Sequence, residues 1–201
     1  RLPEALELIS DLGYEAVAIT PDVGALDPFQ LRPGEVSSTR DQLEDLGLAV
    51  AIETGARFLL DPRRKHRPSL LEEDLDGRVK RVDFYRRCVD LAAELGAGVV
   101  SLWAGSAPSG VLGTLDVDAA HPLGDRLIEG LLQVLEHARG VDVRIGFEPE
   151  PGMFVERPAG FAALLERSGG ALDELGLTLD VGHCVVTGDE PVSETIQRWT
   201  P

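Results

Sequence analysis

Short apolar runs alternate with amphipathic stretches along the chain. In the amphipathic stretches the hydrophobic positions recur every three or four residues, which predicts helices. These helices are expected over 3–12, 37–46, 78–95, 121–139, 158–167 and 192–199. The apolar runs predict strands over 16–20, 48–53, 98–103, 143–148 and 177–180. Because these runs are apolar on both faces, they are typical of a parallel sheet covered by helices.

A leucine followed by a glycine recurs at the joints between helices and strands. The four joints read DLGYEAVAI, DLGLAVAI, ELGAGVVSL and ELGLTLD. In each joint the glycine is expected to supply the left-handed residue that ends the helix and turns the chain back into the sheet. The joints therefore predict a βα architecture, without showing a duplicated sequence.

Two architectures fit this order of elements, a doubly wound open sheet and a (β/α)8 barrel. A dinucleotide-binding sheet often has a G-x-G-x-x-G turn after its first strand, and the sequence has none there. Polar or aromatic residues instead follow several different strands: Asp22, Glu53, Trp103, Glu148 and Asp180. In a barrel all strand ends of this kind meet at one face, where barrel active sites lie. The barrel is therefore favoured.

The chain is short for such a barrel. A complete (β/α)8 barrel has about 250 residues and eight strands, whereas this chain has 201 residues and five predicted strands. It begins on a predicted helix and stops soon after another begins. We therefore expect one incomplete α/β barrel domain over 1–201, without a first strand and without the last two βα units.

Two carboxylates end neighbouring strands of the expected barrel. Glu148 ends the strand RIGF, and Asp180 ends LTL one βα unit later. Facing one mouth without a partner, their charges would repel. A divalent cation removes that cost, and carboxylate oxygens with a nearby imidazole suit Mg²⁺, Mn²⁺, Co²⁺ or Zn²⁺. His183 follows Asp180 by three residues, on the loop expected to leave the strand.

Two further glutamates follow Glu148 along the same loop. Glu150 precedes a proline, and it is either a loop carboxylate or the metal ligand in place of Glu148. Glu156 either reaches back to a substrate or places favourable negative charge before the next helix. The sequence alone leaves both alternatives open.

One basic cluster stands out in an otherwise acidic chain. It lies between 57 and 67 and contains Arg57, Arg63, Arg64, Lys65, His66 and Arg67. Arginines of this kind could bind a phosphate or carboxylate on a substrate. The alternative is a solvated loop or an oligomer contact, such as that of a homodimer. His66 is the member expected at the site. Trp103 could form a wall on which a sugar stacks, or it could cap the core.

Composition limits the classes of partner. The net charge of −16 repels phosphate backbones and argues against nucleic-acid binding. No apolar run approaches the roughly 20 residues of a membrane span. Two cysteines are too few for a disulfide framework, so a reducing cytoplasm is the expected location.

The segments E-P-x-P-G-x-F-V-E and L-D-V-G-H resemble those of the sugar phosphate isomerase/epimerase superfamily, the xylose isomerase-like barrels. This group includes ketose 3-epimerases, hydroxypyruvate isomerase, inosose-processing enzymes and endonuclease IV. The resemblance implies that Glu148 is a metal ligand and an acid/base residue, that Asp180 is a second ligand, and that Glu156 contacts substrate. It implies that His183 contacts substrate hydroxyls in the epimerases and binds metal in the endonucleases. The family's remaining ligands, a histidine and a glutamate on the last two strands, have no counterpart in this chain.

Three functions are compatible with these residues. The first is a metal-dependent isomerase or epimerase of a sugar or sugar phosphate, in which Glu148 moves a proton through an enediolate and His183, Glu156, His66, Trp103 and Glu53 bind the substrate. The second is an endonuclease IV-like phosphodiesterase, which the acidic charge disfavours. The third is a barrel relative that binds a ligand without turning it over.

Overall fold

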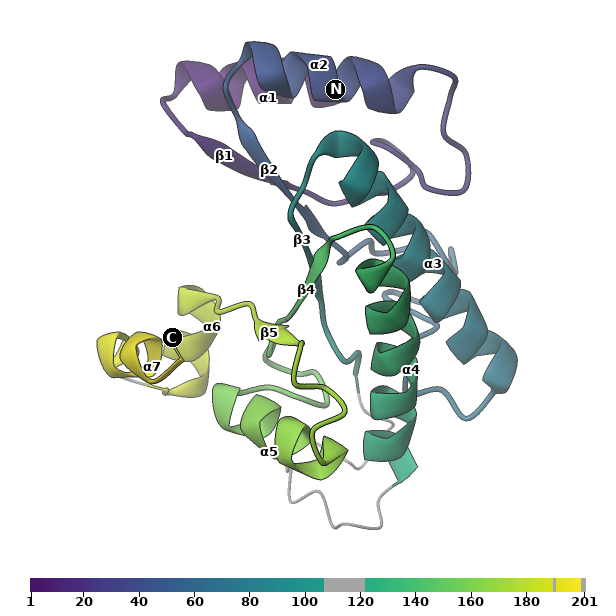
Figure 1. Ribbon diagram of the computed structural model, residues 1–201, viewed down its shortest axis with the longest axis vertical. Helices are drawn as coiled ribbons and strands as arrows, with labels where there is room; N and C mark the ends of the chain where they lie inside the picture. Colours follow the sequence, from purple (N-terminus) through teal and green to yellow (C-terminus); the bar gives the residue numbers. More distant parts are fainter. Residues whose placement is uncertain (107–121, 190, 200–201) are drawn as a thin grey trace.

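The computed structural model describes residues 1–106, 122–189 and 191–199, which form a five-stranded parallel sheet with helices (Figure 1). The strands are β1 (Ala16–Ile19), β2 (Ala49–Glu53), β3 (Val99–Leu102), β4 (Arg144–Phe147) and β5 (Gly176–Leu177). Their order in the sheet is β1-β2-β3-β4-β5, so each strand pairs with the next one in the sequence. A doubly wound sheet reverses its strand order at a switch point. The uninterrupted order is that of consecutive strands in a (β/α)8 barrel, as the strand ends predicted.

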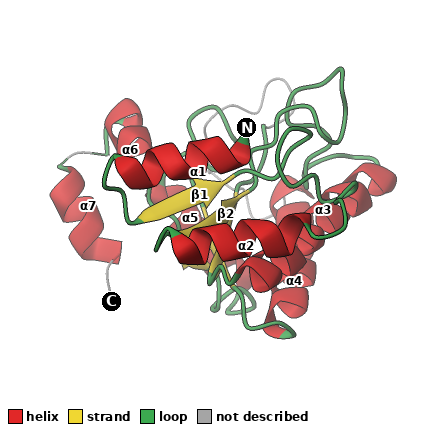
Figure 2. Ribbon diagram, turned by 90° about the horizontal axis from the view of Figure 1, so that it is seen from above, coloured by secondary structure: helices red, strands yellow, loops and turns green. Residues whose placement is uncertain are grey.

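Seven helices are described in these ranges: α1 (Leu2–Asp11), α2 (Glu35–Asp45), α3 (Leu75–Leu95), α4 (Pro122–Arg139), α5 (Pro158–Ser168), α6 (Val181–Thr187) and α7 (Val192–Trp199). Figure 1 shows α3 and α4 side by side, and α6 and α7 beyond β5. Helices α1 and α2 contact each other and lie together above β1 and β2 in Figure 1, and in Figure 2, seen from above, the two strands are visible between them. The ring of Trp199 lies 5.6 Å from that of Phe161, so α7 packs against α5. None of the described helices is long and apolar enough to cross a membrane.

The two faces of the sheet differ in the size of their side chains. Alternate residues of a strand point to opposite faces. One set is large and joins the core beneath the helices: Ile19, Ile52, Val100, Leu102, Ile145 and Phe147. The other set is mostly small, with Ala16, Ala18, Ala49, Ala51, Ser101 and Gly146, and it also contains Glu53, Val99 and Arg144. At the carboxyl ends of the strands, this second face carries the side chains of the candidate site.

Most predicted elements are confirmed, with shifted ends. Helix α3 begins at Leu75 rather than at Arg78, because the Asp74 side chain caps it by accepting the amides of Asp76 and Gly77. The predicted helix over 121–139 is present from Pro122, and His121 lies outside the described residues.

The region after α5 departs further from the prediction. The strand expected over 177–180 pairs only at Gly176–Leu177. Asp180 instead begins a helix, α6, which the sequence pattern did not predict. Gly176 opens the strand and is not the expected left-handed cap, because α5 ends earlier, at Gly169 (φ 60°). The glycines of the other three joints do have positive φ.

Candidate active site at the carboxyl ends of the strands

Three potential metal ligands meet where β4 and β5 end. Glu148 directly follows β4, Asp180 is the N-cap residue of α6, and His183 lies in the first turn of that helix. The Asp180 carboxylate accepts the His183 amide at 2.9 Å, which starts α6 and fixes the distance between the two side chains. His183 Nδ1 lies 3.5 Å from Glu148 Oε1, and His183 Nε2 lies 3.9 Å from Asp180 Oδ2. The cap sets Asp180 and His183 relative to each other, and the pairing of β4 with β5 brings both of them near Glu148.

The dimensions of this cluster fit one divalent cation. One ligand atom from each of Glu148, Asp180 and His183 lies within 4.8 Å of the other two. Bonds to Mg²⁺ or Zn²⁺ are about 2.0–2.2 Å long, so ligand atoms on opposite sides of an ion lie about 4.4 Å apart or less. A shift of the side chains by a few tenths of an ångström would therefore bring their ligand atoms to bonding distance of one ion. The side chains are 14% exposed at Glu148, 43% at Asp180 and 28% at His183, so the site is reachable from solvent.

Glu148 is held in surroundings that disfavour its charge. Burial raises the pKa of its carboxyl group, and the negative charges of Glu53 and Asp180 raise it further, whereas His183 lowers it. On the small-residue face of the sheet, the Ser101 hydroxyl lies 3.3 Å from Glu148 Oε2 and 2.9 Å from Thr178 Oγ1. A raised pKa suits a group that takes up and returns a proton near neutral pH.

Two other carboxylates face the same region. Glu53, at the end of β2, accepts the Thr20 hydroxyl at 2.7 Å, and its charge raises the pKa values of both Glu148 and Glu150. Burial is the main cause of the raised pKa of Glu150, and His183 opposes it. Glu150 therefore faces the site without belonging to the three-residue cluster, while Glu53 lies where the strand ends predicted it.

Glu156 makes a contact within its own loop. Its Oε1 accepts the Gly152 amide at 2.9 Å, which closes the turn between Glu148 and α5. The structure does not bring Glu156 into the cluster with Asp180 and His183. Its predicted contact with a substrate stays a prediction.

Trp103, directly after β3, and His66, in the segment between β2 and α3, pack against each other and form a side wall. The imidazole of His66 meets the indole of Trp103 edge to face, with ring centroids 5.1 Å apart. Trp103 is only 2% exposed, which favours a role in capping the core over an open stacking surface. Burial is the main cause that lowers the pKa of His66, and the charge of Lys65 adds to it. The segment between β2 and α3 starts directly after Glu53, at the carboxyl end of β2, and Lys65 within it lowers the pKa of Glu150.

Parts of the basic cluster are neutralised within the chain. Arg64 Nε lies 2.6 Å from Asp61 Oδ2, and Arg67 Nη1 lies 2.8 Å from Glu72 Oε1. These pairs favour a structural role for two of the arginines, in line with the solvated-loop alternative.

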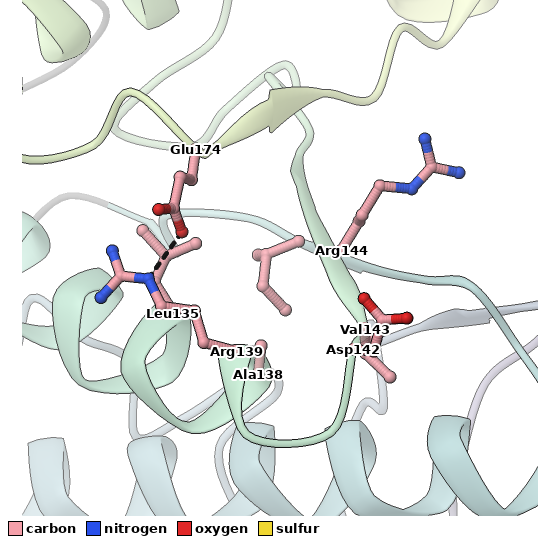
Figure 3. Close-up of a pocket in the computed structure, with 8 residues that line it drawn as sticks. Leu135, Ala138, Arg139, Asp142, Val143, Arg144 and Glu174 are labelled. Carbon is pink, nitrogen blue, oxygen red and sulfur yellow. Dashed lines mark hydrogen bonds and ion pairs between the residues drawn. The ribbon is translucent and has the colours of Figure 1, made fainter.

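A separate cavity lies at the opposite ends of the strands. It has a volume of about 410 Å³ and lies where β4 begins, between α4 and the segment before β5 (Figure 3). Leu135 and Val143 line it, and an ion pair between Arg139 Nε and Glu174 Oε2, 2.6 Å long, spans one wall. Because barrel chemistry takes place at the carboxyl ends, this cavity is not the candidate active site.

Comparison with known families agrees with this geometry. The model of a family described as xylose isomerase-like TIM barrel matches residues 6–199. The chain belongs to this family. Membership in the xylose isomerase-like barrels confirms the superfamily that the motifs suggested.

Solved structures of the same fold include several sugar epimerases. A D-psicose 3-epimerase crystallised in the presence of D-fructose is 16% identical, with a TM-score of 0.74 over 100% of this chain and 65% of its own. An L-ribulose 3-epimerase is 22% identical (TM-score 0.72; 98% and 61%). A 3-keto-D-glucoside 4-epimerase from E. coli is 12% identical (TM-score 0.74; 98% and 70%). The chain thus spans less than two thirds of the length of the first two structures, and at these identities the likeness shows the fold.

Proposed function

We propose that this chain carries part of the active site of a metal-dependent isomerase or epimerase that acts on a sugar or sugar phosphate. The observation that carries the proposal is the convergence of Glu148, Asp180 and His183 at the carboxyl ends of β4 and β5. Its support comes from family membership and from neighbours of the same fold that are sugar epimerases. Glu148 and Asp180 are the proposed metal ligands, and His183 either joins them or contacts a substrate hydroxyl.

Each side chain has a defined task in this proposal. When bound, a divalent cation would polarise a substrate carbonyl and the adjacent hydroxyl oxygen. Glu148 takes the proton from the carbon beside the carbonyl and later returns one, and its raised pKa makes both transfers accessible. His183 Nδ1 lies 3.2 Å from the Pro149 carbonyl oxygen, so Nδ1 serves as the donor and Nε2 is left for a ligand.

Other residues of the carboxyl-end region are proposed to border the substrate. Glu53 is positioned by the Thr20 hydroxyl, and burial raises the pKa of Glu150 while His183 and Lys65 oppose the rise. The wall formed by Trp103 and His66, which lies in the segment between β2 and α3, is also part of this set. Glu156 is proposed to approach the substrate from the loop that it closes with Gly152. The substrate is a small molecule, and the charge of the chain makes a nucleic acid a poor alternative.

The test is proton exchange under controlled metal content. The purified protein is stripped with a chelator, reloaded separately with Mn²⁺, Mg²⁺, Co²⁺ or Zn²⁺, and incubated in D₂O with ketoses and 2-hydroxy aldehydes, both free and phosphorylated. Deuterium at the carbon beside the carbonyl, seen by NMR only after reloading, is the expected result. Absence of metal binding and of exchange with every substrate would overturn the proposal.

Two variants locate the chemistry. Glu148→Gln keeps the shape of the side chain and removes its basicity, so exchange should fall by about 10²- to 10⁴-fold, the usual contribution of a general base. Glu174→Gln is the control, because it removes a carboxylate at the opposite ends of the strands and should exchange as the unmodified protein does. Unchanged exchange in Glu148→Gln would show that another group is the base.

A further inference from the structure

Arg81 is a buried cation that the proposed chemistry does not use. It lies in α3, its side chain is 1% exposed, and no carboxylate of the described residues forms an ion pair with it. Buried charges are costly unless they are paired, and burial lowers the pKa of this guanidinium. A group of this kind needs a structural reason.

Aromatic rings and backbone carbonyls replace the missing carboxylate. The guanidinium carbon lies 5.4 Å from the ring centroid of Phe84, 5.3 Å from that of Tyr85 and 5.4 Å from that of Trp103. Within about 6 Å, the faces of such rings attract a cation, most strongly when water is excluded. Nε donates to the Pro68 carbonyl at 2.7 Å, and Nη2 donates to the His66 carbonyl at 2.9 Å.

Both carbonyls belong to the β2–α3 loop, the segment 54–74 that borders the candidate site. The described part of this loop contains neither helix nor strand, so its shape depends on contacts with its surroundings. Arg81 donates hydrogen bonds to the two loop carbonyls that flank Arg67. Arg67 Nη2 in turn donates to the Ser106 carbonyl at 3.4 Å. These hydrogen bonds connect the loop to α3 and to the segment that follows β3.

The same guanidinium touches both members of the side wall. Its π contact with Trp103 and its hydrogen bond to His66 fix the two residues whose rings meet edge to face. We propose that Arg81 is a positioning residue, which sets the β2–α3 loop and the His66–Trp103 wall relative to the carboxylate cluster. The claim that this wall borders a substrate rests on the proposed function, whereas the claim that Arg81 orders the loop does not.

Arginine suits this position better than lysine. Its planar fork donates to two carbonyls at once, and its flat face stacks on rings, whereas an ammonium group is a point charge on a flexible stem. Arg81→Lys therefore keeps the charge but loses one of the two hydrogen bonds to carbonyls and the stacking on the rings. Arg81→Met loses the charge, both hydrogen bonds and the stacking. Arg86→Met is the matched control, because Arg86 lies on the same helix and donates to the Gln133 carbonyl, away from the loop.

Loop order is measured without substrate. Brief trypsin treatment, read by mass spectrometry, reports cleavage after Arg63, Arg64 and Lys65. The loss of one hydrogen bond to a charged group lowers the free energy of loop opening. Cleavage follows the population of the open loop, so its rate should rise about tenfold in Arg81→Lys. In a Trp199→Phe background, where Trp103 is the remaining tryptophan, Arg81→Lys should also increase the quenching of Trp103 fluorescence by acrylamide. Arg86→Met should match its parent in both measurements.

The outcomes separate the two claims. Wild-type cleavage and quenching in folded Arg81→Met would overturn the inference, and if that variant does not fold, wild-type behaviour of Arg81→Lys would overturn it instead. Faster cleavage with no exchange activity in any protein would support the ordering role and reject only the proposed function. With an active substrate, Arg81→Lys should raise KM about tenfold and change kcat less, since the carboxylates that move the proton are untouched.

Discussion

Gly146, on the small-residue face of β4, leaves room for the hydroxyl pair beneath Glu148. A Cβ added at this position would lie 2.3 Å from Thr178 Oγ1, closer than real Cβ contacts come. The φ of Gly146 is not in the left-handed region, so alanine meets no backbone penalty and the perturbation is steric. Gly146→Ala therefore forces Thr178 to rotate away from Ser101 or pushes β5 outward.

The cost of this substitution follows from the two possible responses. Rotation of Thr178 breaks its 2.9 Å contact with Ser101, which costs about 1 kcal/mol. Displacement of β5 is overpacking, which costs about 1–3 kcal/mol. The reduced freedom of the unfolded chain offsets about 0.4–1 kcal/mol. The net loss is then about 0–0.6 kcal/mol if Thr178 rotates and about 0–2.6 kcal/mol if β5 moves, so Tm should fall by at most about 10 °C for a chain of this size.

Urea unfolding followed by circular dichroism, arranged as a double-mutant cycle, measures the effect. Thr178→Ala alone should cost about 1 kcal/mol, and the double variant should be no less stable than Thr178→Ala, because the clash is gone. Gly98→Ala is the control, since a Cβ there meets nothing within 4 Å, and it should leave stability unchanged or slightly raised. A double variant that loses the full sum of the single losses would refute the steric reasoning.

Two further predictions concern buried titratable groups. Because burial lowers the pKa of His66 below 6.5, its stabilising contribution is present above that pH and is lost as the pH falls through the folded-state pKa, so His66→Gln should narrow the difference in urea stability between pH 7.5 and pH 5. Equal differences in the two proteins would contradict this. Because burial raises the pKa of the Cys88 thiol, iodoacetamide should label Cys88 only after denaturation, and rapid labelling of the folded protein, located by mass spectrometry, would show the assignment to be wrong.

The parts of the fold that were predictable are those with a strong period. The spacing of hydrophobic residues located α1 to α5, and the apolar runs located four strands closely. Helix α6 was missed because seven residues are too few to show a helical period. Its signal was local: Asp180 three residues before His183 is a typical N-cap arrangement, and that cap also shortened the predicted strand.

The site was predictable where it follows from strand ends. Glu148 and Asp180 were expected to meet because parallel strands carry their carboxyl ends to one edge, and the structure brings them together with His183. The contacts of Ser101 were not anticipated, although a serine inside an apolar strand was a signal. Arg81 was also overlooked, yet it precedes Phe84, Tyr85 and Cys88 at the spacing of a buried helix face. Its partners are loop carbonyls, which no sequence pattern records.

The pairing of each strand with its successor also bears on how the chain folds. Ala16 lies opposite Ala49, and Gly146 lies opposite Gly176, so every pairing closes a loop of moderate length. This topology allows the sheet to grow one unit at a time as synthesis proceeds from the N-terminus. The strand pair that carries Glu148 and Asp180 then joins last among those described. In that order of folding, the acidic side chains would meet after the earlier strands have formed the scaffold that holds them.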